Sequence, residues 1–196
     1  MIPEYPLVIN QGASFTRTFN QYGGGKVMAP IEDVSVGYPT VIKVTAHGLP
    51  QISTTPVNVS GVRGATDLNT KACKILRATY VDADHFSMPV STVGQVYKAG
   101  SGEITWYAPT DLTSYTARMH IRVHIDDTAF IHELTTENGG ITLTPADGGI
   151  VLLISATDTA TFDFTTAVYD LEIMDDSDFV TRIVRGQVTL VKEVTR

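Results

Sequence analysis

Apolar and polar residues alternate in short runs along most of the chain, and Gly, Pro, Asn or Asp closes each run. This period of two is typical of half-buried β-strands, because successive side chains point to opposite sides of a sheet. Little helical periodicity is present. The pattern predicts an all-β protein with strands at Leu7–Ile9, Ser14–Asn20, Thr40–Ala46, Pro56–Ser60, Lys74–Tyr80, His85–Met88, Gly102–Tyr107, Thr116–His124, Phe130–Thr135, Ile141–Thr144, Ile150–Ile154, Ala167–Ile173 and Val180–Val191.

The alternation after residue 108 is regular enough to assign faces. Short strands with connections of this length favour an antiparallel sandwich with one buried face per sheet. Within Thr116–His124, one face would hold Arg118, His120, Arg122 and His124. The positions predicted to be buried are Ala117, Met119, Ile121 and Val123, followed by Val168, Leu171, Ile173, Ile183, Val188, Leu190 and Val194.

Two segments interrupt the strand pattern. Gly23-Gly24-Gly25 predicts a flexible exit from the first long strand and a seam between domains, because glycine tolerates variable backbone. In the segment 155–160, Ser155 or Thr157 is expected to cap one helical turn.

A strand-like opening, Gln11–Phe19, finds its continuation only at Asp111–Arg122, and the stretch between has a strand pattern of its own. Residues 31–107 contain six Lys/Arg and six Asp/Glu, whereas the flanking segments contain eight and fifteen, which accounts for the whole net charge of −7. We therefore predict an outer sandwich from residues 1–29 and 108–196, and a charge-neutral β-barrel inserted at 30–107.

Composition narrows the class of protein. The chain has 196 residues, of which 43% are hydrophobic, enough for a packed core. The acidic balance disfavours nucleic acid as a partner, because phosphate binding needs clustered cations. The first residues lack the features of a secretory signal, and no run approaches the about 18 apolar residues of a membrane span. These features predict a protein folded in a reducing cytosol, without a membrane partner, although export without a cleaved signal stays open.

Ordered pieces of the outer segments resemble the N-terminal domains of bacteriophage baseplate and fibre-attachment proteins, a class of small tail-associated virion proteins. The pieces are Gln11–Phe15, Asp111–Arg122, Glu133–Leu143, Leu153–Ala156, Ala167–Glu172 and Val180–Arg182 with Gly186.

Residues Thr159–Glu172 also resemble the E–F corner of immunoglobulin-like domains. The resemblance implies an Ig-like architecture, in which the Tyr169 hydroxyl bonds back to the backbone of the corner. The Cys and Trp of antibody domains are missing from this module, so the likeness concerns architecture alone.

The inserted segment resembles a small β-barrel repeat of phage structural proteins that is named after the first half-domain beside the catalytic cysteine of ubiquitin-activating enzymes. The resembling pieces are Val41–Leu49, Val57–Val62, Asp67–Asn69 and Asp84–Phe86. The resemblance implies the barrel and none of the enzymology. Cys73, the only cysteine, lies in a strand-like run, so we interpret it as structural and not as a nucleophile.

Three histidines raise a metal hypothesis. His120 and His124 share one face of a predicted strand, but strand positions i and i+4 are about 13 Å apart, too far for one ion. Either histidine pairing with His132 across the hairpin, or with another subunit, stays open; an exposed polar face is the default interpretation. We predict no metal or cofactor site.

Two acidic clusters could be either calcium-binding loops or solvated turns. Asp175–Asp178 lacks the glycine and the distal glutamate of an EF-hand and lies between two strands, which favours a solvated hairpin turn. Asp126-Asp127 is interpreted in the same way. The nucleophile-elbow and phosphate-loop motifs are also missing from the sequence, so we predict no catalytic residues and no enzymatic activity.

The resemblances imply a structural subunit of a bacteriophage virion, in the tail, baseplate or fibre-attachment region, assembled in the host bacterial cytoplasm. Its partners would be other virion proteins and further copies in a symmetric homo-oligomer that covers its sheet edges. A head decoration or fibre anchor is an alternative. A host-glycan-binding module is another and would need an exposed aromatic platform; a cell-wall hydrolase is the weakest. The platform candidates are Tyr38, Tyr80, Tyr97 and Trp106.

Overall fold

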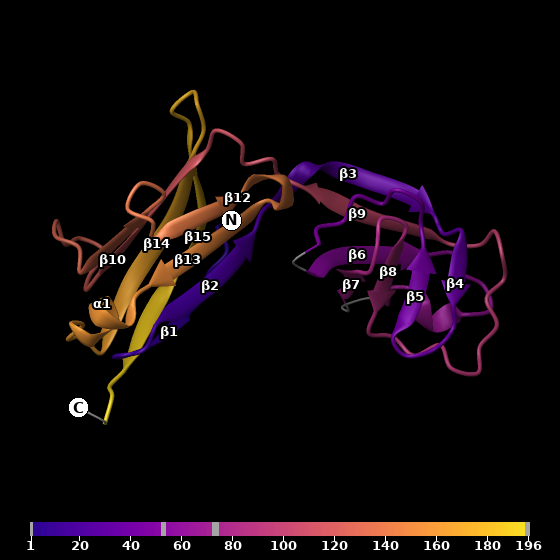
Figure 1. The fold of residues 1–196 in the computed structure, drawn as a ribbon, viewed down its shortest axis with the longest axis horizontal. Coiled ribbons are helices and arrows are strands. Elements are labelled where there is room, and N and C mark those ends of the chain that lie inside the picture. The colour runs from indigo at the N-terminus through magenta and orange to yellow at the C-terminus, as the bar shows by residue number, and fades with distance from the viewer. Residues whose placement is uncertain (1, 52–53, 72–74, 195–196) are drawn as a thin grey trace. The chain divides into compact units, whose positions relative to one another are not determined.

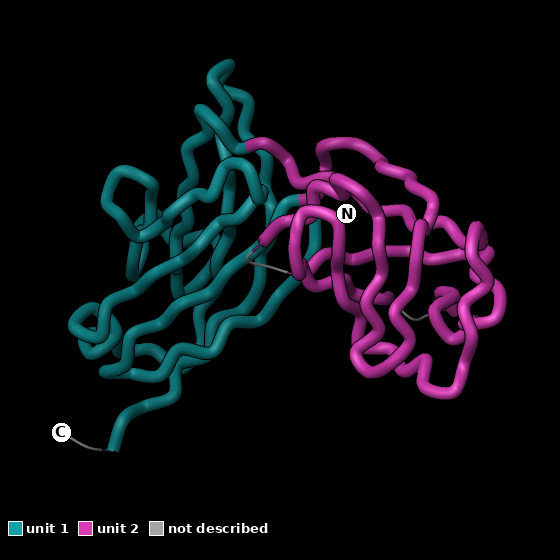
Figure 2. The backbone as a smooth tube through the Cα atoms, turned by 45° about the vertical axis from the view of Figure 1, so that its right-hand side comes forward, with its two compact units in different colours: residues 1–21, 112–196 teal, residues 22–111 magenta. Residues whose placement is uncertain are grey.

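A computed structural model describes residues 2–51, 54–71 and 75–194. The protein is nearly all β, and its sheets are curled and sandwich-like (Figure 1), which confirms the predicted fold class. The chain divides into two compact units, residues 1–21 with 112–196 and residues 22–111 (Figure 2). In the described part of the chain, no helix combines the length and the apolar character needed to span a bilayer.

The outer unit, residues 1–21 and 112–196, contains a five-stranded sheet in the order β1-β15-β14-β10-β11 and a three-stranded sheet in the order β12-β13-β2. Its strand β1 runs parallel to β15, whereas the other pairs are antiparallel, so the sandwich departs from the purely antiparallel prediction at this edge. The elements are β1 (Leu7–Asn10), β2 (Phe15–Asn20), β10 (Thr116–Arg122), β11 (His132–Thr135), β12 (Ile141–Thr144), the 3-10 turn η2 (Pro145–Asp147), β13 (Gly149–Ile154), α1 (Ala156–Ala160), β14 (Thr166–Met174) and β15 (Val180–Val191).

The inner unit, residues 22–111, is one seven-stranded sheet in the order β3-β9-β6-β7-β8-β5-β4. Its two terminal strands, β3 and β4, follow each other in the chain with only two residues between them, so the sheet curls into a barrel-like form. The elements are β3 (Tyr22–Pro30), β4 (Asp33–Ser35), β5 (Thr40–Lys43), β6 (Thr54–Ser60), the 3-10 turn η1 (Thr66–Leu68), β7 (Leu76–Tyr80), β8 (His85–Met88) and β9 (Glu103–Pro109).

Each unit has its own hydrophobic core. The outer core gathers the inward positions of β10, β13, β14 and β15, among them Met119, Ile121 and Leu171. The inner core contains Phe86, Ile104 and Trp106 and shares no residue with the outer one. Burial of this apolar surface is the main stabilising contribution to each unit.

The predicted buried face of β10 is confirmed for Ala117, Met119 and Ile121, but the prediction for Val123 is wrong. The strand ends at Arg122, because the next residues form a turn in which the Asp127 carboxylate accepts a hydrogen bond from the His124 N–H at 2.8 Å. Val123 is therefore exposed. Val194 is also exposed, since it follows the end of β15.

On β14 the buried residues are Ala167, Tyr169, Leu171 and Ile173, whereas Val168 lies on the outer face, half-buried. The prediction that Val168 is a core residue is therefore wrong. On β15 both Ile183 and Val184 are buried, because the register with β14 shifts between Leu171 and Glu172. A bulge of this kind inserts one unpaired residue and changes which face the following side chains occupy.

The glycine run does not form a flexible exit. Gly23–Gly25 lies inside β3, which pairs with β9 and shifts register between Tyr22 and Lys26. Gly25 has a φ of +114°, and a Cβ on Gly24 would lie 2.4 Å from the Pro109 carbonyl oxygen, so this bulge requires glycine. Since β3 belongs to the inner unit, the seams lie after Gln21 and Asp111, not at residues 29 and 107.

The predicted helical turn is confirmed as α1. Ser155 is its N-cap, and its side-chain oxygen accepts a hydrogen bond from the Asp158 N–H at 3.1 Å. Of the two candidate caps, Ser155 and Thr157, the first therefore holds the position.

Candidate functional site

The outward face of the five-stranded sheet is strongly charged. Directly opposed residues on β10, β14 and β15 have opposite charge, as at Arg118 and Glu172, Glu172 and Arg182, and Asp170 and Arg185. Opposed charges on one face of a sheet attract each other across the strands. This face is therefore the polar counterpart of the buried face that carries Met119 and Leu171.

Most charges on this face have a partner of opposite sign. Glu172 accepts from Arg118 at 3.0 Å and from Arg182 at 3.3 Å, and Arg182 also lies 3.4 Å from Asp170. Arg185 is paired with Glu4 at 2.7 Å. Ion pairs as exposed as these contribute at most about 1 kcal/mol each, so they arrange the face more than they stabilise it.

A groove of about 420 Å³ lies on this face. We call it the outer groove and define it by Arg118, His120, Arg122, Ile125, Val168 and Gln187, which line it together with Glu4, Tyr169, Asp170, Glu172, Arg185 and Gly186. Its volume falls within the range of about 300–1,000 Å³ typical of binding pockets. Ile125 and Val168 add apolar side chains to the charged lining of the groove.

Arg122 differs from the other arginines of the face. Its Nη1 donates to the backbone carbonyls of Asp127 at 2.6 Å and Thr128 at 2.8 Å, and its Nη2 donates to the His120 ring at 3.3 Å. Among the residues that the structure describes, no carboxylate forms an ion pair with it. Arg122 therefore holds a cation on backbone carbonyls at the end of a groove that Glu4, Asp170 and Glu172 also line.

The same contacts orient the His120 ring. A guanidinium only donates, so Nδ1 accepts from Arg122 in the 3.3 Å contact, and Nε2 donates to Glu133 at 2.9 Å. The ring also stacks on Phe130 with a centroid distance of 5.0 Å. Both ring nitrogens of His120 and one face of its ring therefore have partners.

The structure contradicts the pairing of His120 with His132 across the hairpin. His120 lies opposite Glu133 on the outer face, whereas His132 lies opposite the buried Ile121 and packs against Phe162 at 5.5 Å. His124 lies in the turn after β10. Within residues 2–51, 54–71 and 75–194, no three His, Cys, Asp or Glu side chains gather as metal ligands. Cys73 lies outside the described residues.

Tyr169 is buried, but it does not bond to the E–F corner as the resemblance implied. Its hydroxyl donates instead to the Tyr5 carbonyl at 2.8 Å, which ties the N-terminal segment to β14. Burial raises the pKa of this hydroxyl, because the anion would lose its hydration. On β15, Gly186 lies directly opposite, and a Cβ there would come within 2.1 Å of the same carbonyl oxygen.

The acidic turn between β14 and β15 is confirmed as a hairpin turn. The Asp175 carboxylate accepts hydrogen bonds from the N–H groups of Ser177 at 2.9 Å and Phe179 at 3.0 Å. Hydrogen bonds from Ser177 and Phe179 hold the pKa of Asp175 below its ordinary value. Asp126-Asp127 also forms a turn, in which Asp127 accepts from His124.

The four aromatic residues of the glycan hypothesis do not share one exposed surface. Trp106 is buried in the inner core. The Tyr97 hydroxyl donates to the carbonyls of Ile31 at 3.0 Å and Ser101 at 2.7 Å, and Tyr80 is half-buried. Tyr38 is exposed. Side chains alternate along β9, and Trp106 points into the core. The sequence does not show which face of this strand is buried, so Trp106 could be offered as an exposed residue.

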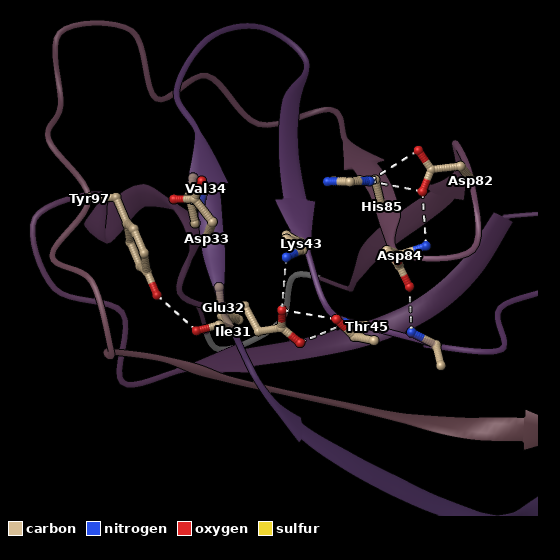
Figure 3. A network of polar contacts seen from close by, with 11 residues as sticks. Ile31, Glu32, Asp33, Val34, Lys43, Thr45, Asp82, Asp84, His85 and Tyr97 are labelled. Atoms are coloured by element: carbon tan, nitrogen blue, oxygen red, sulfur yellow. Dashed lines mark hydrogen bonds and ion pairs between the residues drawn. The ribbon is translucent and has the colours of Figure 1, made fainter.

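A polar network connects the β4–β5 region of the inner unit with the turn before β8 (Figure 3). The Glu32 carboxylate accepts from the Thr45 N–H at 2.9 Å and its hydroxyl at 3.0 Å, and it pairs with Lys43 at 3.3 Å. Asp84 accepts from the Ala46 N–H at 2.9 Å, and Asp82 is paired with His85 at 2.8 Å. These contacts hold the loops of this region in place.

Glu32→Gln is expected to flatten the acid dependence of inner-unit stability. The hydrogen bonds from Thr45, led by its N–H, lower the pKa of Glu32 below 4.5, so its contribution is complete above that pH. The contribution disappears as pH falls through the lower folded-state pKa, a loss observable between about pH 5 and pH 3. Urea midpoints followed by tryptophan fluorescence across this range measure it. Glu103→Gln is the control, because Glu103 makes none of these contacts; equal acid dependence in both variants would contradict the assignment.

No known family model matches the chain, and no curated protein matches it. Sequence patterns did not single out Ile125, Phe130 or Phe179, although each is a large apolar residue beside an acidic turn, which was the available signal.

Proposed function

We propose that the protein is a non-enzymatic structural subunit of a bacteriophage virion, in the tail, baseplate or fibre-attachment region. It acts by docking: the outer unit contacts neighbouring copies, and the inner unit contacts another virion protein. The ordered resemblance of the outer segments to tail-associated proteins suggests the setting, and the surface of the outer unit supports the mode of action.

The observation that carries the proposal is the exposure of large apolar side chains on the outer unit next to open sheet edges. Val8 lies on the edge strand β1, Val191 lies on its neighbour β15, and Leu153 lies outward on β13. Unpaired edges and apolar outward positions are liabilities in a monomer and are covered in assemblies. A closed symmetric assembly would bury them.

Purified virions provide the test. Antibodies against the outer unit should decorate one defined region of the particle, and mass spectrometry of washed particles should detect the protein at a constant copy number. Light scattering of the purified protein should show a mass above that of a monomer. A compact monomer that is absent from washed particles would overturn the proposal.

A further inference from the structure

The outer unit carries two complementary surfaces at opposite ends of one sheet. The first is the outer groove, whose Arg122 and Ile125 lie at and beyond the end of β10. The second is the β14–β15 hairpin tip, Asp175–Phe179, which adjoins the Met174–Val180 pair. Thr116, at the start of β10, lies opposite Met174, so the tip and the groove end are separated by most of the length of the strand.

The hairpin tip is preorganised. The Asp175 N–H donates to the Phe179 carbonyl at 3.2 Å, and the Asp178 N–H donates to the Asp175 carbonyl at 3.2 Å. Asp178 has a φ of +63°, which matches a three-residue hairpin loop that ends in the left-handed region. A loop held in this way loses little conformational entropy when it binds.

The tip presents an aromatic ring beside carboxylates. The Phe179 side chain is 68% exposed, although burial of a phenyl ring would be favourable. Asp176 and Asp178 are exposed, and neither carboxylate has a partner among the described residues. Asp175 is committed to the turn, so these two are the acidic groups available to a partner.

The outer groove offers the matching features. Ile125 is 74% exposed and Val168 is half-buried, which gives an apolar surface. Arg122 supplies a positive charge that forms no ion pair with a carboxylate of the described residues 2–21 and 112–194 of its unit. Arg122 is already fixed by two backbone carbonyls and the His120 ring, and it can donate its remaining N–H groups to an incoming carboxylate.

We propose that the hairpin tip of one copy docks into the outer groove of the next copy, with Phe179 against Ile125 and Val168 and with Asp176 or Asp178 against Arg122. The contact is intermolecular, because Arg122 lies six residue steps along the strand from Thr116, which holds a copy's own tip about 20 Å from its Arg122. Two different surfaces meet, so the contact is head-to-tail and closes into a ring or continues as a filament. This inference rests on the proposed function and specifies which surfaces of the outer unit meet between neighbouring copies.

The test uses two variants of the full chain, Phe179→Ser and Ile125→Ser, followed by sedimentation velocity. Both side chains are exposed, so the fold should be kept, which circular dichroism checks. Each change should weaken self-association by about tenfold or more, the loss expected for removing an apolar anchor. Val96→Ser is the matched control, since Val96 is 80% exposed and belongs to the inner unit, and it should leave self-association unchanged.

Mixing gives the sharper result. Phe179→Ser keeps an intact groove and Ile125→Ser keeps an intact tip, so an equimolar mixture should form 1:1 dimers that grow no further. Self-association of both variants at wild-type strength, failure of the mixture to form dimers, or a wild-type chain that stays monomeric would each overturn the inference. If the protein is nevertheless found in washed virions, only the hairpin contact has failed; absence from virions would remove the proposed function itself.

Discussion

Leu171→Ala is expected to destabilise the outer unit by about 2–5 kcal/mol, the range for deleting a fully buried leucine side chain. Leu171 is completely buried in the middle of β14, where it packs with the outer core. The loss combines the transfer free energy of the removed methyl groups with the cavity that remains. Urea unfolding followed by far-ultraviolet circular dichroism measures the free energy of unfolding.

The inner unit should not respond to this change, because the two cores share no residue. Trp106 is the only tryptophan of the chain and belongs to the inner core, so its fluorescence reports that unit alone. The fluorescence midpoint should stay in place while the dichroism transition of the outer unit moves. Leu153→Ala, on an exposed position, should change stability by less than about 0.5 kcal/mol. A fluorescence midpoint that shifts with Leu171→Ala would show that the units unfold together.

Removal of the inner unit should leave the outer unit folded. Deletion of residues 22–111, with Gln21 joined to Leu112 through a short Gly-Ser linker, keeps every strand of both outer sheets. The two ends are close, because the Gln21 N–H donates to the Gly148 carbonyl at 2.8 Å and the Leu112 N–H donates to the Pro145 carbonyl at 3.2 Å. An insert with neighbouring ends can be removed at little cost to the host domain.

The shortened chain should unfold cooperatively at the denaturant midpoint of the outer unit in the full chain, and its amide spectrum should be dispersed. Residues 22–111 expressed alone are the matched control, since β3 and β9 pair close to both of its ends. A shortened chain that is unfolded or aggregated, while the full chain is folded, would show that the outer unit depends on the insert.

The position of each arginine in its strand decides whether it meets a carboxylate on the outward face of the five-stranded sheet. Arg118, Arg182 and Arg185 are placed opposite carboxylates by strand register, and their charges are offset within the unit. Arg122 lies at the strand end, where its neighbours are backbone carbonyls of a turn. The cation that remains available to a partner is therefore the one at the boundary between strand and loop.

Local features of the fold were predictable from the sequence. The alternation around Met119 and Ile121 predicts a strand with one buried face, and the structure places both in the outer core. Ser155 is a strong helix-capping residue ahead of a short polar run and caps α1. The hairpin turn at Asp175–Asp178 follows from turn-forming residues between two strands. Each inference depends on a few neighbouring residues, whose conformational preferences act before any long-range contact forms.

Contacts between residues far apart in the chain were not predictable from the sequence. Tyr169 was expected to bond to the corner that precedes it, yet its hydroxyl reaches Tyr5, 164 residues away. The glycines at 23–25 suggested a flexible exit from a strand, but pairing with β9 makes them a bulge. One sequence is compatible with several registers between distant strands, and a shift by one residue exchanges the two faces.

The sequence by itself therefore determined the all-β class, most of the strand positions and the buried face at Ala117, Met119 and Ile121, because these follow from a period of two and from turn chemistry. Only the tertiary structure decided that His120 meets Glu133, that Trp106 is buried, and that Arg122 lacks a carboxylate in the described part of the chain. Such contacts depend on strand register and on the bulge at Leu171/Glu172, which arise when segments far apart in the chain pack around a common core.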